Sequence, residues 1–163
     1  MRARTLLAAA LLAPLLLGAC SGGDQRGSQA QRMDAWVRTT TFGERAGQLR
    51  ATADAVAQLG DRPVTSTVLA TRCAVMLVDV QADNGDLPSP DRRVTDLLAQ
   101  AYTGYAKAGI ACAKEAKAGA DHPSAEVLNG LAWATTQLLQ ALNRIELISG
   151  RAVATSTTVP PAA

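Results

Sequence analysis

The stretch "SPDRRVTDLLAQAYTGYAKAGIAC", Ser89–Cys112, carries the clearest helical pattern in the chain. Its apolar residues recur in steps of three and four, the spacing that places side chains on one face of an α-helix. Ser89 followed by Pro90 predicts the start of the helix, because proline is tolerated at the first helical position. The segment is therefore predicted to be a helix that buries one stripe: Val94, Leu98, Ala101, Tyr105, Ala108 and Cys112.

Two earlier segments repeat this pattern. In the first, "TFGE" at Thr41–Glu44 has the S/T-x-x-E form of a capping box, so a helix either begins there or bends after residues 31–40. It is expected to end at Gly60. The second is expected to run from about Pro63 to the turn signals of "ADNGDLPSP", residues 82–90. Their stripes hold Phe42, Ala46, Leu49, Ala53 and Val56, then Leu69, Cys73, Met76 and Val80.

The last periodic segment opens near Asp121–Ser124 and aligns Leu128, Leu131, Thr135, Leu138, Leu142 and Ile145. No segment alternates with period two for long enough to predict a strand. Four helices with short connections predict an all-α fold, with an antiparallel four-helix bundle as the default architecture. We expect the helical domain to span residues 31–150.

The N-terminus has the organisation of an export signal. Arg2 and Arg4 precede the apolar run "TLLAAALLAPLLL", which is too short for a transmembrane helix of roughly 20 residues. The following residues Leu17-Gly18-Ala19-Cys20 resemble the lipobox of bacterial lipoproteins. The resemblance implies that residues 1–19 are a signal peptide, that the thiol of Cys20 receives a diacylglyceryl group, and that the chain is anchored to the outer face of the cytoplasmic membrane. The alternative is an ordinary secretory signal with an incidental cysteine.

Lipidation of Cys20 would leave two cysteines, Cys73 and Cys112, in a compartment that permits oxidation. Both lie on the apolar stripes of their helices, so we expect a disulfide between them. A tight turn would place them at different heights, so the bond requires the 82–90 connection to run along the bundle. Two buried free thiols or a redox-active pair are the alternatives.

Both ends of the chain lack a helical pattern. Residues 20–30 are expected to form a flexible Gly/Ser-rich tether behind the lipidated cysteine, and residues 151–163 a disordered Thr/Pro-rich tail.

The whole chain has 16 Lys+Arg and 14 Asp+Glu, and Arg2 and Arg4 lie in the predicted signal peptide, so residues 20–163 carry 14 of each sign. A neutral domain gives no indication of nucleic-acid binding.

The sequence offers little catalytic chemistry. His122 is the only histidine, and it stands beside Pro123 at a predicted helix start, where a solvated residue is more common than a catalyst. None of the four glutamates is followed three residues later by histidine, as a di-iron bundle requires. We therefore expect a protein that is not an enzyme and that uses neither a metal nor another cofactor.

Three surface features could support binding. Trp133 lies off the apolar stripe of the last helix, in a row with Gly130, and could form a partner contact; alternatively its ring leans over the core edge. Lys107, Lys114 and Lys117 could meet anionic headgroups or simply be solvated. An apolar ligand could lie between the helices, or the core could be filled.

Two functions follow from these features. The first is a non-enzymatic interaction module that binds another protein of the cell envelope. The alternative is a carrier or sensor that holds an apolar small molecule between its helices. The helical domain also resembles small alanine-rich secreted helical proteins of high-GC Gram-positive bacteria, without diagnostic motifs. An internal cavity would favour the carrier, whereas a filled core with an exposed Trp133 would favour the interaction module.

Overall fold

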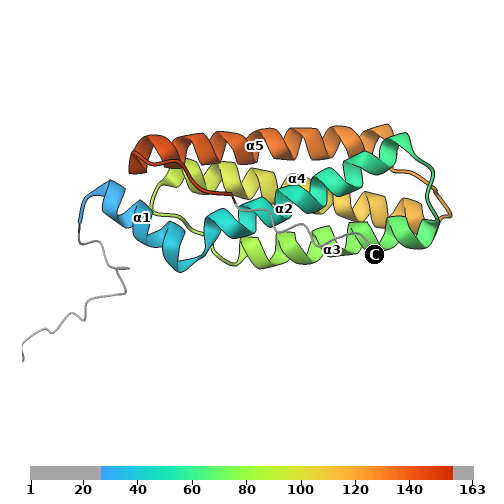
Figure 1. The fold of residues 1–163 in the computed structure, drawn as a ribbon, viewed down its shortest axis with the longest axis horizontal. Coiled ribbons are helices and arrows are strands. Elements are labelled where there is room, and N and C mark those ends of the chain that lie inside the picture. Colours follow the sequence, from blue (N-terminus) through green and yellow to red (C-terminus); the bar gives the residue numbers. More distant parts are fainter. Residues whose placement is uncertain (1–26, 156–163) are drawn as a thin grey trace, which may run out of the picture.

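The computed structural model describes residues 27–155, and these residues form helices and connecting segments without a strand. The all-α prediction is therefore confirmed for this part of the chain. In Figure 1 the longer helices lie lengthwise beside one another, and the shortest α-helix lies at one end. The elements are α1 (Gln29–Thr39), α2 (Phe42–Ala57), the 3₁₀ turn η1 (Gln58–Asp61), α3 (Ser66–Asn84), α4 (Arg92–Lys117) and α5 (Ala125–Ser149).

The short helix α1 begins inside the predicted tether. Gln31 N donates to Ser28 Oγ at 3.3 Å, and Ser28 N donates to Gln31 Oε1 at 2.8 Å. These reciprocal bonds are a capping box of the S-x-x-Q form. The tether prediction is therefore wrong for its last residues, because the helix starts at Gln29. Residues 20–26 of the tether, with Cys20, and the predicted signal peptide lie outside the described residues.

The predicted capping box at Thr41–Glu44 is not formed. Thr41 adopts a left-handed backbone conformation, with φ of 51°, and its side chain makes no capping hydrogen bond. The chain changes direction at this residue, so the first predicted segment becomes two helices, α1 and α2. The rings of Trp36 and Phe42 pack across the break with centroids 4.9 Å apart.

The core lies between the long helices, and α4 packs against both α3 and α5. Small residues allow the close approach. A Cβ atom on Gly109 would lie 2.8 Å from Leu77 Cδ2 of α3, and one on Gly104 would lie 2.8 Å from Trp133 Cζ3 of α5. Because carbon atoms do not approach that closely, glycine at these two positions allows the side chains of Leu77 and Trp133 to lie against the backbone of α4.

The connection between α3 and α4 is shorter than predicted. α3 continues to Asn84, and Asp91, rather than Ser89, caps α4, so Pro90 precedes the helix. Cys73 lies 11 residues before the end of α3, or about 17 Å, and Cys112 lies 20 residues after the start of α4, or about 30 Å. Residues 85–91 therefore cover an axial offset of about 14 Å, which an extended seven-residue segment spans easily.

The predicted disulfide joins these two helices. Cys73 and Cys112 are bonded, their Cα atoms are 5.9 Å apart, and both are fully buried. The cross-link spans 39 residues of sequence, for which the chain-entropy model gives a stabilisation of about 4 kcal/mol. The covalent link therefore fixes the axial register of α3 against α4.

Asp91 connects three helices at one end of the fold. Arg144 of α5 donates to both of its carboxylate oxygens at 3.0 Å, and Gln29 of α1 donates to one of them at 2.9 Å. Val94 N donates to the same side chain as the N-cap bond of α4. The hydrogen bonds from Arg144 are the main cause that lowers the pKa of Asp91.

Among residues 27–155, no helix has the length and apolar character needed to cross a membrane.

Candidate interaction surface

Trp133 is a half-exposed aromatic side chain on α5, with 48% of its surface accessible. Its six-membered ring lies against Gly104 of α4, so one part of the side chain contacts the neighbouring helix while another part faces solvent. The ring covers the edge of the core, as one of the two sequence interpretations expects, and it also presents apolar surface; the partner contact stays a prediction. An exposed tryptophan with such support is the residue type most enriched at binding hot spots.

Gly130 lies one turn before Trp133 and is partly buried. A Cβ atom placed on it would lie 3.4 Å from the Cβ of Ala108 in α4. The residue therefore lies beside the neighbouring helix, and its part in a partner contact stays a prediction. Glu126 and Gln140, two turns before and after Trp133 in the same row of α5, are exposed polar residues.

The other sequence candidates are exposed to solvent. Lys107, Lys114 and Lys117 are exposed along α4. His122 is also exposed, and its Nδ1 lies 2.6 Å from Oδ1 of the adjacent Asp121 in the connection before α5. Among the described residues, no three His, Cys, Asp or Glu side chains are placed to hold a metal ion.

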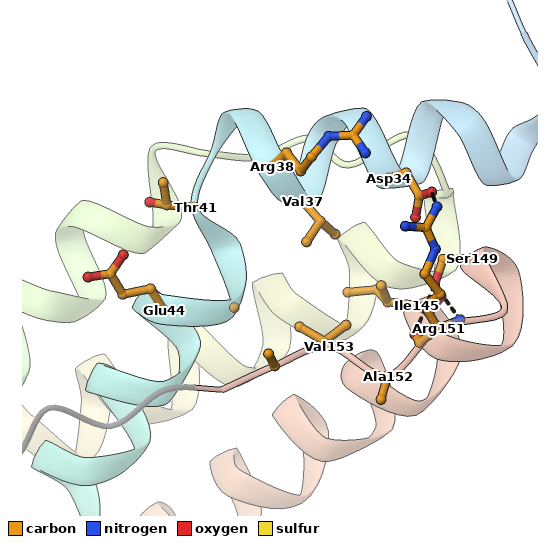
Figure 2. Close-up of a pocket in the computed structure, with 12 residues that line it drawn as sticks. Asp34, Val37, Arg38, Thr41, Glu44, Ile145, Ser149, Arg151, Ala152 and Val153 are labelled. Carbon is orange, nitrogen blue, oxygen red and sulfur yellow. Dashed lines mark hydrogen bonds and ion pairs between the residues drawn. The ribbon is translucent and has the colours of Figure 1, made fainter.

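A groove between α1, α2 and the end of α5 holds the first residues of the predicted tail. We call residues 151–154 the C-terminal segment. Figure 2 shows Val153 pointing toward Val37 and Ile145, while Arg151 reaches Asp34 at the rim and forms an ion pair with it. The hollow beside them has a volume of about 380 Å³. Residues 151–155 of the predicted tail are thus described and lie against the domain, and residues 156–163 are outside the described part.

Gly43 allows the C-terminal segment to approach α2. A Cβ atom on this residue would overlap the carbonyl oxygen of Ala154 and contact Val153 at 3.2 Å. The sequence signal for this contact was weak, because Val153 is one apolar residue within a Thr/Pro-rich stretch. The groove thus accepts an extended backbone with one apolar side chain.

Asp83 is a buried carboxyl group that the sequence interpretation missed. It is 3% exposed, and its Oδ2 has no hydrogen-bond partner within the described residues. Burial raises its pKa to about 7; the charges of Asp79 and Asp86 act in the same direction, and Arg45 opposes them. Its position continues the buried stripe of α3 after Met76 and Val80, which was the available signal.

Asp83 of α3 and the groups around it come from four helices. Arg45 of α2 forms an ion pair with Asp86, whose carbonyl oxygen accepts a hydrogen bond from Trp36 Nε1 of α1 at 3.1 Å. Tyr102 of α4 is also buried here, and desolvation raises the pKa of its phenol. The cluster therefore couples a titratable carboxyl to the contact between the α1–α2 break and the end of α3.

Comparison with models of protein families finds no match, and comparisons with curated proteins and with solved structures find none either. The function must therefore be inferred from the chain's own residues.

The raised pKa of Asp83 predicts a pH-dependent stability. The folded state binds a proton with a pKa of about 7, whereas an unfolded aspartate has one near 4. The free energy of unfolding should therefore fall as the pH rises from about 4 to about 7. Asp83→Asn removes the ionisation, so it should stabilise the protein at pH 8 by up to about 4 kcal/mol and change little at pH 4.

Urea unfolding of both proteins at the two pH values measures this effect. The exposed control Asp96→Asn should change the free energy of unfolding far less at either pH. Asp83 would not carry this ionisation cost if its asparagine variant were no more stable than the wild type at pH 8.

Proposed function

We propose that this chain is a lipid-anchored protein of the cell envelope, held on the outer face of the cytoplasmic membrane, whose helical domain binds another envelope protein. The observation that carries the binding role is the half-exposed ring of Trp133, supported from behind by Gly104. A rigid aromatic side chain offers a large contact area at a small cost in conformational entropy. The domain acts by binding and not by catalysis.

The anchor rests on the N-terminal sequence and on the cysteines. Arg2, Arg4, a short apolar run and "LGAC" stand in the order of a lipoprotein signal. The Cys73–Cys112 disulfide is consistent with an oxidising compartment, since structural disulfides are rare in reducing cytosol. Together they support export followed by attachment through Cys20.

The architecture we propose for the binding domain is an antiparallel four-helix bundle with α1 added at one end. The colour order in Figure 1 supports it, because α2, α3, α4 and α5 alternate in direction along the long axis. The connection between α4 and α5 is closed by Glu115, which accepts hydrogen bonds from Ser124 Oγ at 2.6 Å and from Ser124 N at 3.0 Å. Short connections of this kind favour antiparallel neighbours.

A carrier for an apolar small molecule is the second candidate. It is supported by the groove of Figure 2, whose apolar lining includes Val37, Ile145 and Val153 and whose volume falls within the range of ligand pockets. The groove lies at one end of the domain, where α1, the start of α2 and the end of α5 meet. The Trp133 surface supports the interaction module more directly, because exposed tryptophans are enriched at binding hot spots.

Cys20→Ala tests the anchor. Without a thiol to accept the diacylglyceryl group, the variant should accumulate as an unprocessed precursor and incorporate no labelled fatty acid. Metabolic labelling, with the precursor and mature forms separated by mass, measures both effects. A variant that is processed and labelled like the wild type would show that Cys20 is not the attachment point.

Trp133→Ala tests the binding role. Proteins that co-purify with the wild-type chain from solubilised membranes should be reduced about tenfold or more in the variant, since hot-spot tryptophans contribute at least 2 kcal/mol. Quantitative mass spectrometry measures the loss. The matched control is Leu147→Ala, which removes a more exposed apolar side chain from the same helix about 21 Å away.

The control should retain the co-purifying proteins. The proposal fails if the wild type captures no envelope protein beyond background, or if Trp133→Ala captures the same proteins in the same amounts.

A further inference from the structure

The helix α3 has an apolar stripe on its solvent side in addition to the one in the core. Val68, Val75 and Val78 on this side are 43%, 42% and 66% exposed. With Thr71 and Ala82, they recur in alternating steps of three and four, which are the a and d positions of a heptad repeat. Figure 1 places α3 along one edge of the molecule. This outer stripe, residues 68, 71, 75, 78 and 82, has the pattern of a helix that packs against another helix.

The charged residues beside the outer stripe are complementary to those of a second copy of the chain. Arg72 and Asp79 each follow a d position, so both are e positions on the same edge of the stripe. Thr52 Oγ1 of α2 donates to Asp79 Oδ2 at 3.0 Å and holds that carboxylate at the edge. The g positions on the opposite edge, Ala74 and Gln81, are uncharged.

Antiparallel pairing of two copies would bury the outer stripe and also pair Arg72 of each copy with Asp79 of the other. When Val75 lies opposite the partner's Val78, the same two-fold axis places Thr71 opposite the partner's Ala82. In this register Arg72 and the partner's Asp79 differ in height by two residues, or about 3 Å, which an arginine side chain spans. The symmetry forms this ion pair twice. A parallel pair would instead place Arg72 against an uncharged g position.

We propose that two copies of this chain associate through the outer stripe of α3 as an antiparallel two-fold dimer, with Val75 and Val78 at its centre and two Arg72–Asp79 ion pairs at its edge. Such an interface is isologous, so it closes at two copies. Because only about two heptads take part, the dimer is weak and depends on concentration. The proposal is independent of Trp133, which lies on α5 and packs against α4.

Charge reversal tests the register. Arg72→Asp gives two acidic e positions and Asp79→Arg gives two basic ones, so each variant should repel its own copies. An equal mixture of the two variants should form dimers, since every acidic position then meets a basic one. The chain that carries both substitutions should dimerise like the wild type. Sedimentation equilibrium of the full-length protein in density-matched detergent measures the mass.

Two further variants test the surface itself. Val78→Glu should yield monomers, whereas Leu147→Glu, on the exposed side of α5, should leave the dimer unchanged. Circular dichroism and thermal unfolding check that each variant is folded. A wild type that stays monomeric at the highest concentration, single variants that remain dimeric, or a mixture that remains monomeric would each overturn the proposal.

Discussion

The close contact of α4 with both of its neighbours is the constraint on which the rest of the fold depends. Gly104 and Gly109 leave no room for a side chain, because Trp133 of α5 and Leu77 of α3 already occupy the space. Cys112 lies one turn after Gly109, so the short distance that brings Leu77 close also brings Cys73 within bonding distance. Dense packing of this kind tolerates few changes of volume.

The contact at Gly104 also explains how Trp133, which covers the edge of the core, comes to form an exposed apolar surface. Trp133 could not lie over α4 if position 104 carried a Cβ atom, so its ring would move farther into solvent or disturb Ala134. Held by Gly104, the ring presents a defined apolar surface. Such preorganisation would lower the entropy cost of the binding that we propose. The disulfide adds to it by fixing α4 against α3.

Much of the long-helix framework could be predicted from local sequence patterns. The steps of three and four in α4 and α5 reflect burial of one face, and the disulfide followed from an even pair of cysteines on two stripes. The ends of helices were less predictable. The true capping box at Ser28 lay in a Gly/Ser-rich stretch, whereas the motif at Thr41 was present without its hydrogen bond.

Other features depend on contacts that are distant in sequence. The burial of Asp83 depends on the α1–α2 break lying against the end of α3. Val153 contacts the core only because the C-terminal segment lies in the groove. Trp133 was identified as a candidate, but its support came from a glycine 29 positions earlier, which no local pattern connects to it. The outer stripe of α3 could be recognised only once the buried face of that helix was known.

Two matched glycine substitutions test the central role of this contact most directly. Gly104→Ala and Gly130→Ala both add one methyl group in a helix, which by propensity alone favours folding by up to about 1 kcal/mol. At position 130 the added Cβ would make an ordinary 3.4 Å contact, so the free energy of unfolding should stay the same or rise. At position 104 it would clash with Trp133 and Ala134, so the free energy of unfolding should fall by about 1–3 kcal/mol. Equal effects of the two substitutions would contradict the account.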